Sequence, residues 1–278
     1  MATTEDDWRT LNRANWDERV AVHLGAPVYE VDTLREGRGR LNGIEEAELG
    51  PVAGRRILHL QCHFGRDSLI LAQRGAEVVG LDFSVPAIEA ANRLAAELGV
   101  ADRARFVVAD LYAASEAVPE PAAFDLVYVT WGAINWLPDI KGWATIVAWF
   151  LKPGGRLYLA ESHPTALVLD DLARLQDGRP GWFVPYFQRE PLVLEDASDY
   201  AEPGARLANV RQVCWMHPLG AIVGALLEAG LALRFLHEHD AVPWRMFEVL
   251  VKGPDGLFRW PDRPWWPLAF SLAADRPR

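Results

Sequence analysis

Residues 56–84 read RILHLQCHFGRDSLILAQRGAEVVGLDFS, and this stretch decides the predicted fold. It begins with an apolar run at 57–60, which is typical of a strand buried on both faces. A polar turn follows, and then a helix for which Asp67 and Ser68 are the expected N-terminal caps. Residues 77–82 predict a second buried strand that ends in an aspartate. A carboxylate at that position can bind the two hydroxyls of a ribose, so the stretch predicts half of a nucleoside-binding site.

Strands and helices continue to alternate after this stretch. Apolar runs at 105–109, 124–129 and 156–160 predict further strands, and helices are expected at 85–98 and 143–151. Short links between these elements indicate a parallel sheet covered by helices on both faces, which is the doubly wound α/β class.

The segments on either side of this core are interpreted as additions to a single domain. Residues 1–50 start with helical spacing and are expected to form a cap over the ligand, with a short extended piece at 28–31. The cofactor-binding core is then expected at 51–165. Residues 166–216 carry prolines, aromatic residues and strand-like pieces, which indicate a small antiparallel insertion that covers the substrate.

Residues 217–278 are expected to return to the main fold. A helix is predicted at 219–229, followed by strands at 231–238 and 245–252. The two strands are too close for a helical crossover, so they should pair antiparallel through a turn at 240–243. No structure is predicted for the tail, which is rich in proline and tryptophan.

Composition favours a small-molecule site. The chain has 278 residues, half of them apolar, and a net charge of −10, which argues against binding to nucleic acid. Two cysteines far apart, Cys62 and Cys214, are typical of a reducing cytoplasm. The N-terminal residues lack the apolar core of a signal peptide, and no apolar run approaches the roughly 20 residues of a membrane span. We therefore expect a cytoplasmic protein without a membrane partner.

The loop after the first strand discriminates between two nucleoside cofactors. A dinucleotide needs glycines there, because its pyrophosphate approaches the backbone at the helix N-terminus. Gln61, His63 and Arg66 stand where that fingerprint has glycines, so the fingerprint is absent. S-adenosylmethionine has no phosphate and tolerates a bulkier loop, and a sheet ending in an antiparallel pair also suits its enzymes.

Over residues 55–160, and more loosely in the final strand pair, the chain resembles class I S-adenosylmethionine-dependent methyltransferases. That family usually has D/E-x-G-x-G-x-G at the first strand and loop, whereas HLQCHFG at 59–65 keeps only the last glycine. The chain is also similar to a branch of the family with an H-L-Q-C-H-F-G loop. The W-D segment and the H-P pair of that branch are matched by Trp16-Asp17 and His163-Pro164. The resemblance implies a Rossmann-like, mostly parallel seven-stranded sheet with an antiparallel C-terminal pair.

The resemblance also implies roles for single residues. Asp82 would bind the ribose, Phe83 would flank the adenine, Asp110 with Leu111 would bind the adenine edge, and Tyr29 would contact the methionine carboxylate. The full set of candidate cofactor-binding residues is Tyr29, Gln61, His63, Gly65, Asp82, Phe83, Asp110, Leu111 and Thr130. Three structural alternatives stay open: the two aspartates could each cap a helix, His63 could satisfy local backbone groups, and Cys62 could be a buried filler.

Residues that contact the methyl acceptor should follow the fourth and fifth strands. The candidates are Trp131, Asn135, Trp136 and Glu161, with His163 or His217 as the base if the acceptor must lose a proton. Each histidine could equally be a structural one bonded to backbone, and the tryptophans could belong to the core. No metal is expected, because the sequence H-E-H-D at 237–240 has no evident third ligand.

These observations predict methylation of a small, apolar or aromatic metabolite, with the acceptor atom (oxygen, nitrogen or carbon) left open. A role in secondary metabolism is one hypothesis. The alternatives are a nicotinamide-dependent oxidoreductase on a degenerate dinucleotide fold and a non-catalytic S-adenosylmethionine binder. The sequence leaves open whether the protein is a monomer or a homodimer.

Overall fold

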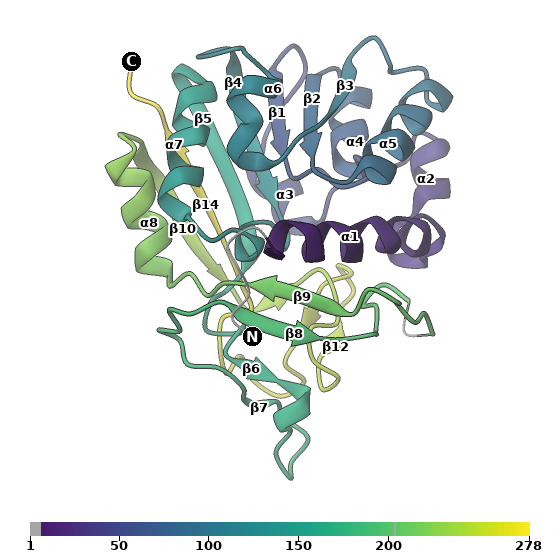
Figure 1. Cartoon of the computed structure of the whole chain (residues 1–278), viewed down its shortest axis with the longest axis vertical. Coiled ribbons are helices and arrows are strands. Elements are labelled where there is room, and N and C mark those ends of the chain that lie inside the picture. Colours follow the sequence, from purple (N-terminus) through teal and green to yellow (C-terminus); the bar gives the residue numbers. More distant parts are fainter. Residues whose placement is uncertain (1–6, 203) are drawn as a thin grey trace.

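The computed structural model describes residues 7–202 and 204–278. Its centre is a seven-stranded sheet with the order β10-β14-β5-β4-β1-β2-β3 (Figure 1). Neighbouring strands from β1 to β5 are parallel, whereas β14 runs antiparallel to both β5 and β10. The predicted doubly wound class and the seven-stranded sheet are therefore confirmed. The strands are β1 (Arg56–Leu60), β2 (Glu77–Asp82), β3 (Ala104–Val108), β4 (Phe124–Thr130), β5 (Leu151–Ser162), β10 (Ala232–His239) and β14 (Ala269–Asp275).

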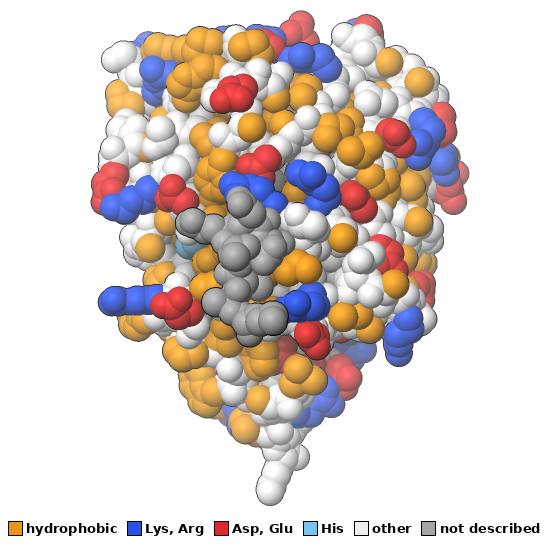
Figure 2. Space-filling model, viewed as in Figure 1, with side chains coloured by type: hydrophobic (Ala, Val, Ile, Leu, Met, Phe, Trp, Pro, Cys, Tyr) orange, Lys and Arg blue, Asp and Glu red, His pale blue; other side chains and the backbone are white. Residues whose placement is uncertain are grey.

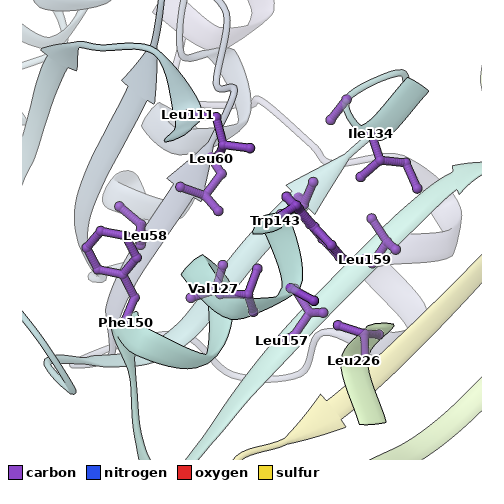
Figure 3. Close-up of a cluster of buried hydrophobic side chains, with 14 of the residues drawn as sticks. Leu58, Leu60, Leu111, Val127, Ile134, Trp143, Phe150, Leu157, Leu159 and Leu226 are labelled. Atoms are coloured by element: carbon purple, nitrogen blue, oxygen red, sulfur yellow. The ribbon is translucent and has the colours of Figure 1, made fainter. Parts of the chain in front are cut away.

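Helices cover both faces of the sheet because successive strand residues point to opposite sides. Leu58 and Val127 belong to the cluster on one face, whereas their neighbours Ile57 and Leu126 belong to the cluster on the other. Figure 3 shows the first cluster, in which the fully buried Trp143 lies among leucines of the strands. The helices on that face are α6 (Ala114–Ala117), α7 (Ile140–Phe150) and α8 (Leu219–Glu228), and those on the other face are α4 (Arg66–Gln73) and α5 (Val85–Glu97).

The N-terminal segment lies across the ends of the strands. Helix α1 (Asp7–Gly25) runs along this edge of the sheet and contacts α5 and β9 (Arg211–Cys214) (Figure 1). The helix predicted at the start of the chain is confirmed from Asp7 onward, and residues 1–6 lie outside the described part. The same segment contains a second, shorter helix, α3 (Gly43–Glu48).

The extended piece predicted at 28–31 is wrong. The chain forms a 3-10 turn, η1 (Pro27–Tyr29), and then α2 (Val31–Arg35). Proline suits the first position of a helical turn, since its φ is already fixed near the helical value. Helix α2 buries Val31 and Leu34, which lie three residues apart on one side of it.

The insertion after β5 is antiparallel, as predicted, but it consists of two separate strand pairs. β6 (Leu169–Asp170) pairs with β7 (Gly181–Trp182), and β8 (Leu192–Glu195) pairs with β9. In Figure 1 these pairs lie on the far side of α1 from the main sheet.

The predicted antiparallel C-terminal pair and its strand at 231–238 are confirmed, but the position predicted for the second strand is wrong. β10 pairs with β14, which comes from the tail for which no structure was predicted, and not with residues 245–252. Every residue of 269–274 is buried, because β14 lies between β5 and β10 and is covered on both faces. Residues 241–259 instead form a small sheet of β11 (Ala241–Val242), β12 (Val251–Lys252) and β13 (Phe258–Arg259).

The charges on the surface are mixed. On the face in Figure 2, Lys and Arg side chains alternate with Asp and Glu side chains and do not merge into one basic surface. A phosphate backbone binds to clustered cations, so this face does not favour nucleic acid. Among the helices of the described residues, none has the length and apolar character needed to cross a membrane.

Candidate active site

A cavity of about 440 Å³ lies where the carboxyl ends of the strands meet α1. Ligands of open α/β sheets bind at this edge, and the volume is in the ordinary range for small-molecule sites. The wall at the strand ends includes Gln61, His63, Asp82, Phe83, Asp110, Leu111, Thr130, Trp131, Asn135 and Trp136. The opposite wall includes Trp8, Asn12, Trp16, Tyr29, Tyr200, Pro243, Trp244 and Met246. We call these the strand-end wall and the cover wall.

The loop after β1 has an unusual backbone. Gln61, His63 and Gly65 all have positive φ, at 56°, 52° and 73°. Non-glycine residues rarely adopt this conformation, and where they do it often marks a functional site. The bulky side chains are thus held in a turn that glycines usually form in such loops.

Gly65 has a packing role and does not line the cavity. A Cβ atom there would lie 2.5 Å from a ring carbon of Phe106, so only glycine fits between the loop and that ring. Gly65 is also the N-cap of α4, which corrects the prediction of Asp67 and Ser68 as caps. Its left-handed conformation starts the helix directly at Arg66, so Asp67 falls within the first turn.

Asp82 lies at the tip of β2 and faces the cavity. Its Oδ2 accepts the backbone N–H of His63 at 2.9 Å, and its Oδ1 accepts that of Ser84 at 2.9 Å. Ser84, not Asp82, caps α5, because its hydroxyl accepts the N–H of Ala87. Burial raises the pKa of Asp82 to about 6, so the carboxylate is ionised at neutral pH and retains free lone pairs toward the cavity.

Asp110 combines a structural and a cavity-facing position. Its Oδ1 accepts the N–H of Tyr112 and so caps the 3-10 turn η2 (Leu111–Ala113), as the capping alternative predicted. Its Oδ2 is 3.0 Å from the Arg9 guanidinium of α1. Asp110 therefore lines the cavity beside Leu111 and also links the strand-end wall to the cover.

Gln61 leaves one polar atom unsatisfied. Its Nε2 donates to the carbonyl oxygen of Ala133 at 2.8 Å, which fixes the orientation of the amide. Its Oε1 is buried and has no hydrogen-bond partner among the residues that the structure describes. Buried acceptors are nearly always paired, so this orphan acceptor on a cavity-lining residue fits a ligand that carries a hydrogen-bond donor.

Aromatic side chains surround the part of the cavity beyond β4. The Trp131 indole N–H donates to Glu45 Oε1 of α3 at 2.8 Å, and its ring packs edge-on against Trp244. Trp136 packs edge-on against Trp16 of α1. The two tryptophans predicted after strand four thus line the cavity together with Asn135, opposite tryptophans of the cover.

Glu161 does not line the cavity, contrary to its assignment as a substrate-binding residue. Its buried carboxylate accepts the backbone N–H groups of Gly132, Ala133 and Ile134 at 2.5 to 3.0 Å. These bonds satisfy the turn that carries Trp131, and Glu161 acts through that turn. Burial raises the pKa of the carboxyl above its ordinary value.

Neither His163 nor His217 is among the described residues that line the cavity. His163 Nδ1 is 2.6 Å from the Thr165 hydroxyl, and its Nε2 is 3.1 Å from Glu238. His217 Nε2 donates to the carbonyl oxygen of Leu137 at 2.7 Å. Burial lowers the pKa of both imidazoles. The structural alternative therefore describes both positions better than the role of a base.

A polar cluster lies beside the cavity; sequence reasoning named two of its members, Tyr29 and His63, but missed the other four and the contacts that join them. His23 Nε2 is 3.0 Å from Asp199 Oδ2, which also accepts a hydrogen bond from the Arg19 guanidinium at 2.8 Å. His23 Nδ1 is 2.9 Å from His63 Nε2 and 3.0 Å from the Tyr29 hydroxyl. The Tyr29 hydroxyl is 2.5 Å from that of Tyr200. The polar cluster comprises Arg19, His23, Tyr29, His63, Asp199 and Tyr200.

The sequence does contain a signal for this cover. Trp8, Asn12, Trp16, Arg19 and His23 recur at intervals of three or four residues, so they share one side of α1. All except the half-buried Trp16 are buried. A helix that buries polar residues along one stripe is an uncommon feature, and buried polar side chains often belong to a site.

The comparisons with known proteins agree with this geometry. Residues 57–155 match the protein family described as "Methyltransferase domain". A demethylmenaquinone methyltransferase from Clavibacter sepedonicus is 38% identical over 122 residues, which cover 43% of this chain and 47% of that protein. A ubiquinone biosynthesis O-methyltransferase from Ralstonia nicotianae is 31% identical over 140 residues, which cover 50% of this chain and 54% of that protein.

The chain spans about half the length of these curated relatives. Among solved structures, an S-adenosylmethionine-dependent methyltransferase from Mesorhizobium loti superposes with a TM-score of 0.58 at 22% identity. The superposition covers 84% of this chain and 96% of that chain. The fold is therefore the Rossmann-like fold found in class I methyltransferases, and residues 57–155 are similar to the methyltransferase-domain family.

Proposed function

We propose that the protein transfers a methyl group from S-adenosylmethionine to a small, apolar or aromatic metabolite. The observation that carries the proposal is that Asp82 and Gln61, whose Oε1 has no hydrogen-bond partner among the described residues, lie on the same wall of a cavity of about 440 Å³. A carboxylate suits ribose hydroxyls, and an unpaired amide oxygen suits an ammonium group. S-adenosylmethionine carries both of these groups.

The strand-end wall would hold this cofactor along its length. Asp82 would accept hydrogen bonds from the ribose, while Phe83 and Leu111 would enclose the adenine and Asp110 would accept from its amino group. Gln61, Thr130 and Tyr29 would surround the amino-acid end. S-adenosylmethionine supplies an electrophilic methyl group on a sulfonium, so the protein mainly has to exclude water and align the acceptor with that group.

The aromatic part of the cavity supports an apolar or aromatic acceptor. Trp131, Trp136, Trp244 and Met246 offer flat and polarisable surfaces, and Asn135 adds a polar group that could orient a ring substituent. The two curated relatives are named for demethylmenaquinone and for ubiquinone biosynthesis, which supports a ring-containing acceptor for this chain as well.

A nicotinamide dinucleotide is less well suited to the same site. Its pyrophosphate would have to lie at the N-terminus of α4, where the bulky side chains of Gln61 and His63 replace the glycines that let a pyrophosphate approach the backbone. Calorimetric titration with S-adenosylhomocysteine and with NADH separates the two. We expect saturable binding of the first only, and binding of NADH alone would refute the proposal.

Turnover distinguishes an enzyme from a non-catalytic binder. The assay is formation of S-adenosylhomocysteine from S-adenosylmethionine with a panel of phenols, hydroquinones, amines and aromatic carboxylic acids. We expect product with at least one class of ring-containing acceptor. Tight binding without product across the whole panel would favour a binding protein.

A further inference from the structure

The polar cluster includes buried charged groups that the proposed function does not use. His23 and Asp199 are 0% and 2% exposed, whereas Tyr29, His63 and Tyr200 line the cavity. The cluster therefore has an inner row, formed by Arg19, His23 and Asp199, and an outer row that faces the ligand. Burying so many polar groups costs free energy unless their hydrogen bonds are satisfied or used.

The hydrogen bonds of His23 have a direction that follows from Asp199. An ionised carboxylate only accepts, so His23 Nε2 carries the hydrogen between them. In a neutral imidazole Nδ1 must then accept, and the Tyr29 hydroxyl and His63 Nε2 compete to donate to it. One donor of the outer row is thereby directed inward, away from the cavity.

We propose that the polar cluster binds the carboxylate of a ligand and that His23 takes up one proton from solvent when it does so. The added proton sits on Nδ1, which then donates to the Tyr29 oxygen or to His63 Nε2. This reversal frees the hydroxyl of Tyr29 or that of Tyr200 to donate to the carboxylate, while the other still donates within the pair. The one covalent bond formed is the N–H bond of His23, and its proton comes from solvent. The inference rests on the proposed function, because it assigns a further ligand group to the same cavity.

The charges of the cluster support this reversal. Burial opposes ionisation of Asp199, but the hydrogen bond from His23 lowers the pKa of Asp199 to about 2, so it is ionised and balances the charge of Arg19. Burial, together with the neighbouring His23, lowers the pKa of His63 well below its ordinary value, so His63 is neutral. An incoming carboxylate would meet no net positive charge. A proton on His23 supplies that charge, and its ion pair with Asp199 stabilises it.

The other titratable groups around His23 can be separated from it by experiment. Asp199 and Tyr200 face it from the insertion, His63 from the loop after β1, Tyr29 from η1, and Arg19 from α1 itself. Asp82 contacts the backbone of His63 and does not contact His23 directly. Because the pKa of Asp82 is about 6, this carboxyl loses its proton mostly below the pH range of the measurements. Measurements at about pH 7.5 keep Asp82 ionised.

The test compares two ligands of the unmodified protein. S-adenosylhomocysteine carries the amino-acid end, and 5′-methylthioadenosine has the same nucleoside without a carboxylate. Titration calorimetry in phosphate and in Tris, which have different ionisation enthalpies, gives the number of protons taken up on binding. We expect uptake approaching one proton for S-adenosylhomocysteine and none for 5′-methylthioadenosine. The affinity for S-adenosylhomocysteine should accordingly rise as pH falls from about 8 to about 7, by up to about tenfold per pH unit.

A second arm identifies the source of the carboxylate. Benzoate is titrated into protein saturated with each nucleoside. Proton uptake with S-adenosylhomocysteine alone assigns the cluster to the amino-acid end of the cofactor. Uptake only when benzoate is added assigns it to an acceptor carboxylate. Absence of uptake in every titration overturns the inference, while nucleoside binding itself would leave the proposed function standing.

Variants locate the proton. His23→Gln and Asp199→Asn should abolish the uptake, and Tyr200→Phe, which removes one hydroxyl from a half-exposed side chain, should weaken S-adenosylhomocysteine without affecting 5′-methylthioadenosine. His237→Gln is the matched control, since His237 is exposed on β10 beside Glu48. Undiminished uptake in a folded His23→Gln protein would overturn the role of His23. The comparison of two ligands on the unmodified chain remains decisive if that variant does not fold.

Discussion

The two walls of the cavity are built in different ways. The strand-end wall comes from residues 61–136, in which each side chain lies at the end of a strand of the parallel sheet or in the loop after it. The cover wall combines α1, η1, the insertion and the loop at 243–246, which are far apart in the sequence. The position of the first wall follows from the topology of the sheet, whereas that of the second depends on long-range contacts such as Asn12 with Val213.

This difference suggests a division of labour. The strand-end wall carries the groups proposed to bind the nucleoside, and the cover wall adds tryptophans and the polar cluster. We therefore expect changes in the nucleoside-binding groups of the first wall to alter cofactor affinity, and changes in the tryptophans of the second wall to alter the choice of acceptor. The predictions below test that division, beginning with the largest expected effect.

Asp82→Ala should lower the affinity for S-adenosylhomocysteine by about 100-fold, because charge-assisted hydrogen bonds to two ribose hydroxyls are lost. Titration calorimetry measures the effect. Asp139→Ala is the matched control, since Asp139 also accepts two backbone N–H groups, at the start of α7, and does not line the cavity. Equal loss of affinity in both variants would show that the effect is structural.

Glu45→Gln should stabilise the fold increasingly as pH rises. Burial raises the pKa of Glu45 to about 8 from 4.5, so between these values the unfolded chain releases a proton that the folded chain keeps. The wild type therefore loses stability over this range, on the order of 3 kcal/mol, and the glutamine variant does not. Denaturant unfolding at several pH values measures the difference.

Glu89→Gln, on the exposed side of α5, is the control for the Glu45 variant. A stability difference between Glu45→Gln and wild type that stays constant with pH would refute the assignment. Glu45 also accepts the hydrogen bond of Trp131, which the glutamine oxygen can retain. The variant therefore removes the charge of Glu45 but keeps its hydrogen bond to Trp131, so the two effects can be measured separately.

Trp244→Ala should change which acceptors are methylated while leaving S-adenosylhomocysteine affinity within about twofold. The substitution removes the indole that packs against Trp131 and widens the aromatic part of the cavity. Product formation over the acceptor panel, together with titration calorimetry, gives both readouts. A large loss of cofactor affinity with an unchanged acceptor profile would contradict the division between the walls.

His163→Gln and His217→Gln should have the smallest effect. Neither residue is among the described residues of the cavity wall, so S-adenosylhomocysteine affinity and turnover should stay within about twofold of wild type. Thermal unfolding would report any structural cost. A selective loss of turnover in either folded variant would restore the prediction that these histidines act as bases.

The sequence predicts the local parts of this molecule well. The strand, loop and strand around Gly65 are contiguous, so the position of Asp82 follows from the order of apolar runs and turns. The same reasoning cannot show that Gly65 faces Phe106 and not the cavity, because that contact joins two different strands and their loops. The place of a side chain on the strand-end wall was thus easier to predict than its exact contacts.

Long-range pairing explains most of the errors. Residues 245–252 and 269–275 are both plausible strands next to residues 231–238, and only burial between two neighbours selects the second. Similarly, His23 gains its significance from Asp199, which lies 176 residues away. The periodicity of α1 predicts that His23 is buried, but it does not predict which residue His23 contacts.

The central position of β14 has a consequence for synthesis on the ribosome. β5 and β10 both precede β14 in the chain, yet they join only through it. A nascent chain can therefore assemble β1 to β5, with the strand-end wall, while β5 still exposes an unpaired edge. Until β14 emerges, that edge is open to pairing with another nascent chain, so the interval between the synthesis of β5 and that of β14 exposes the protein to aggregation.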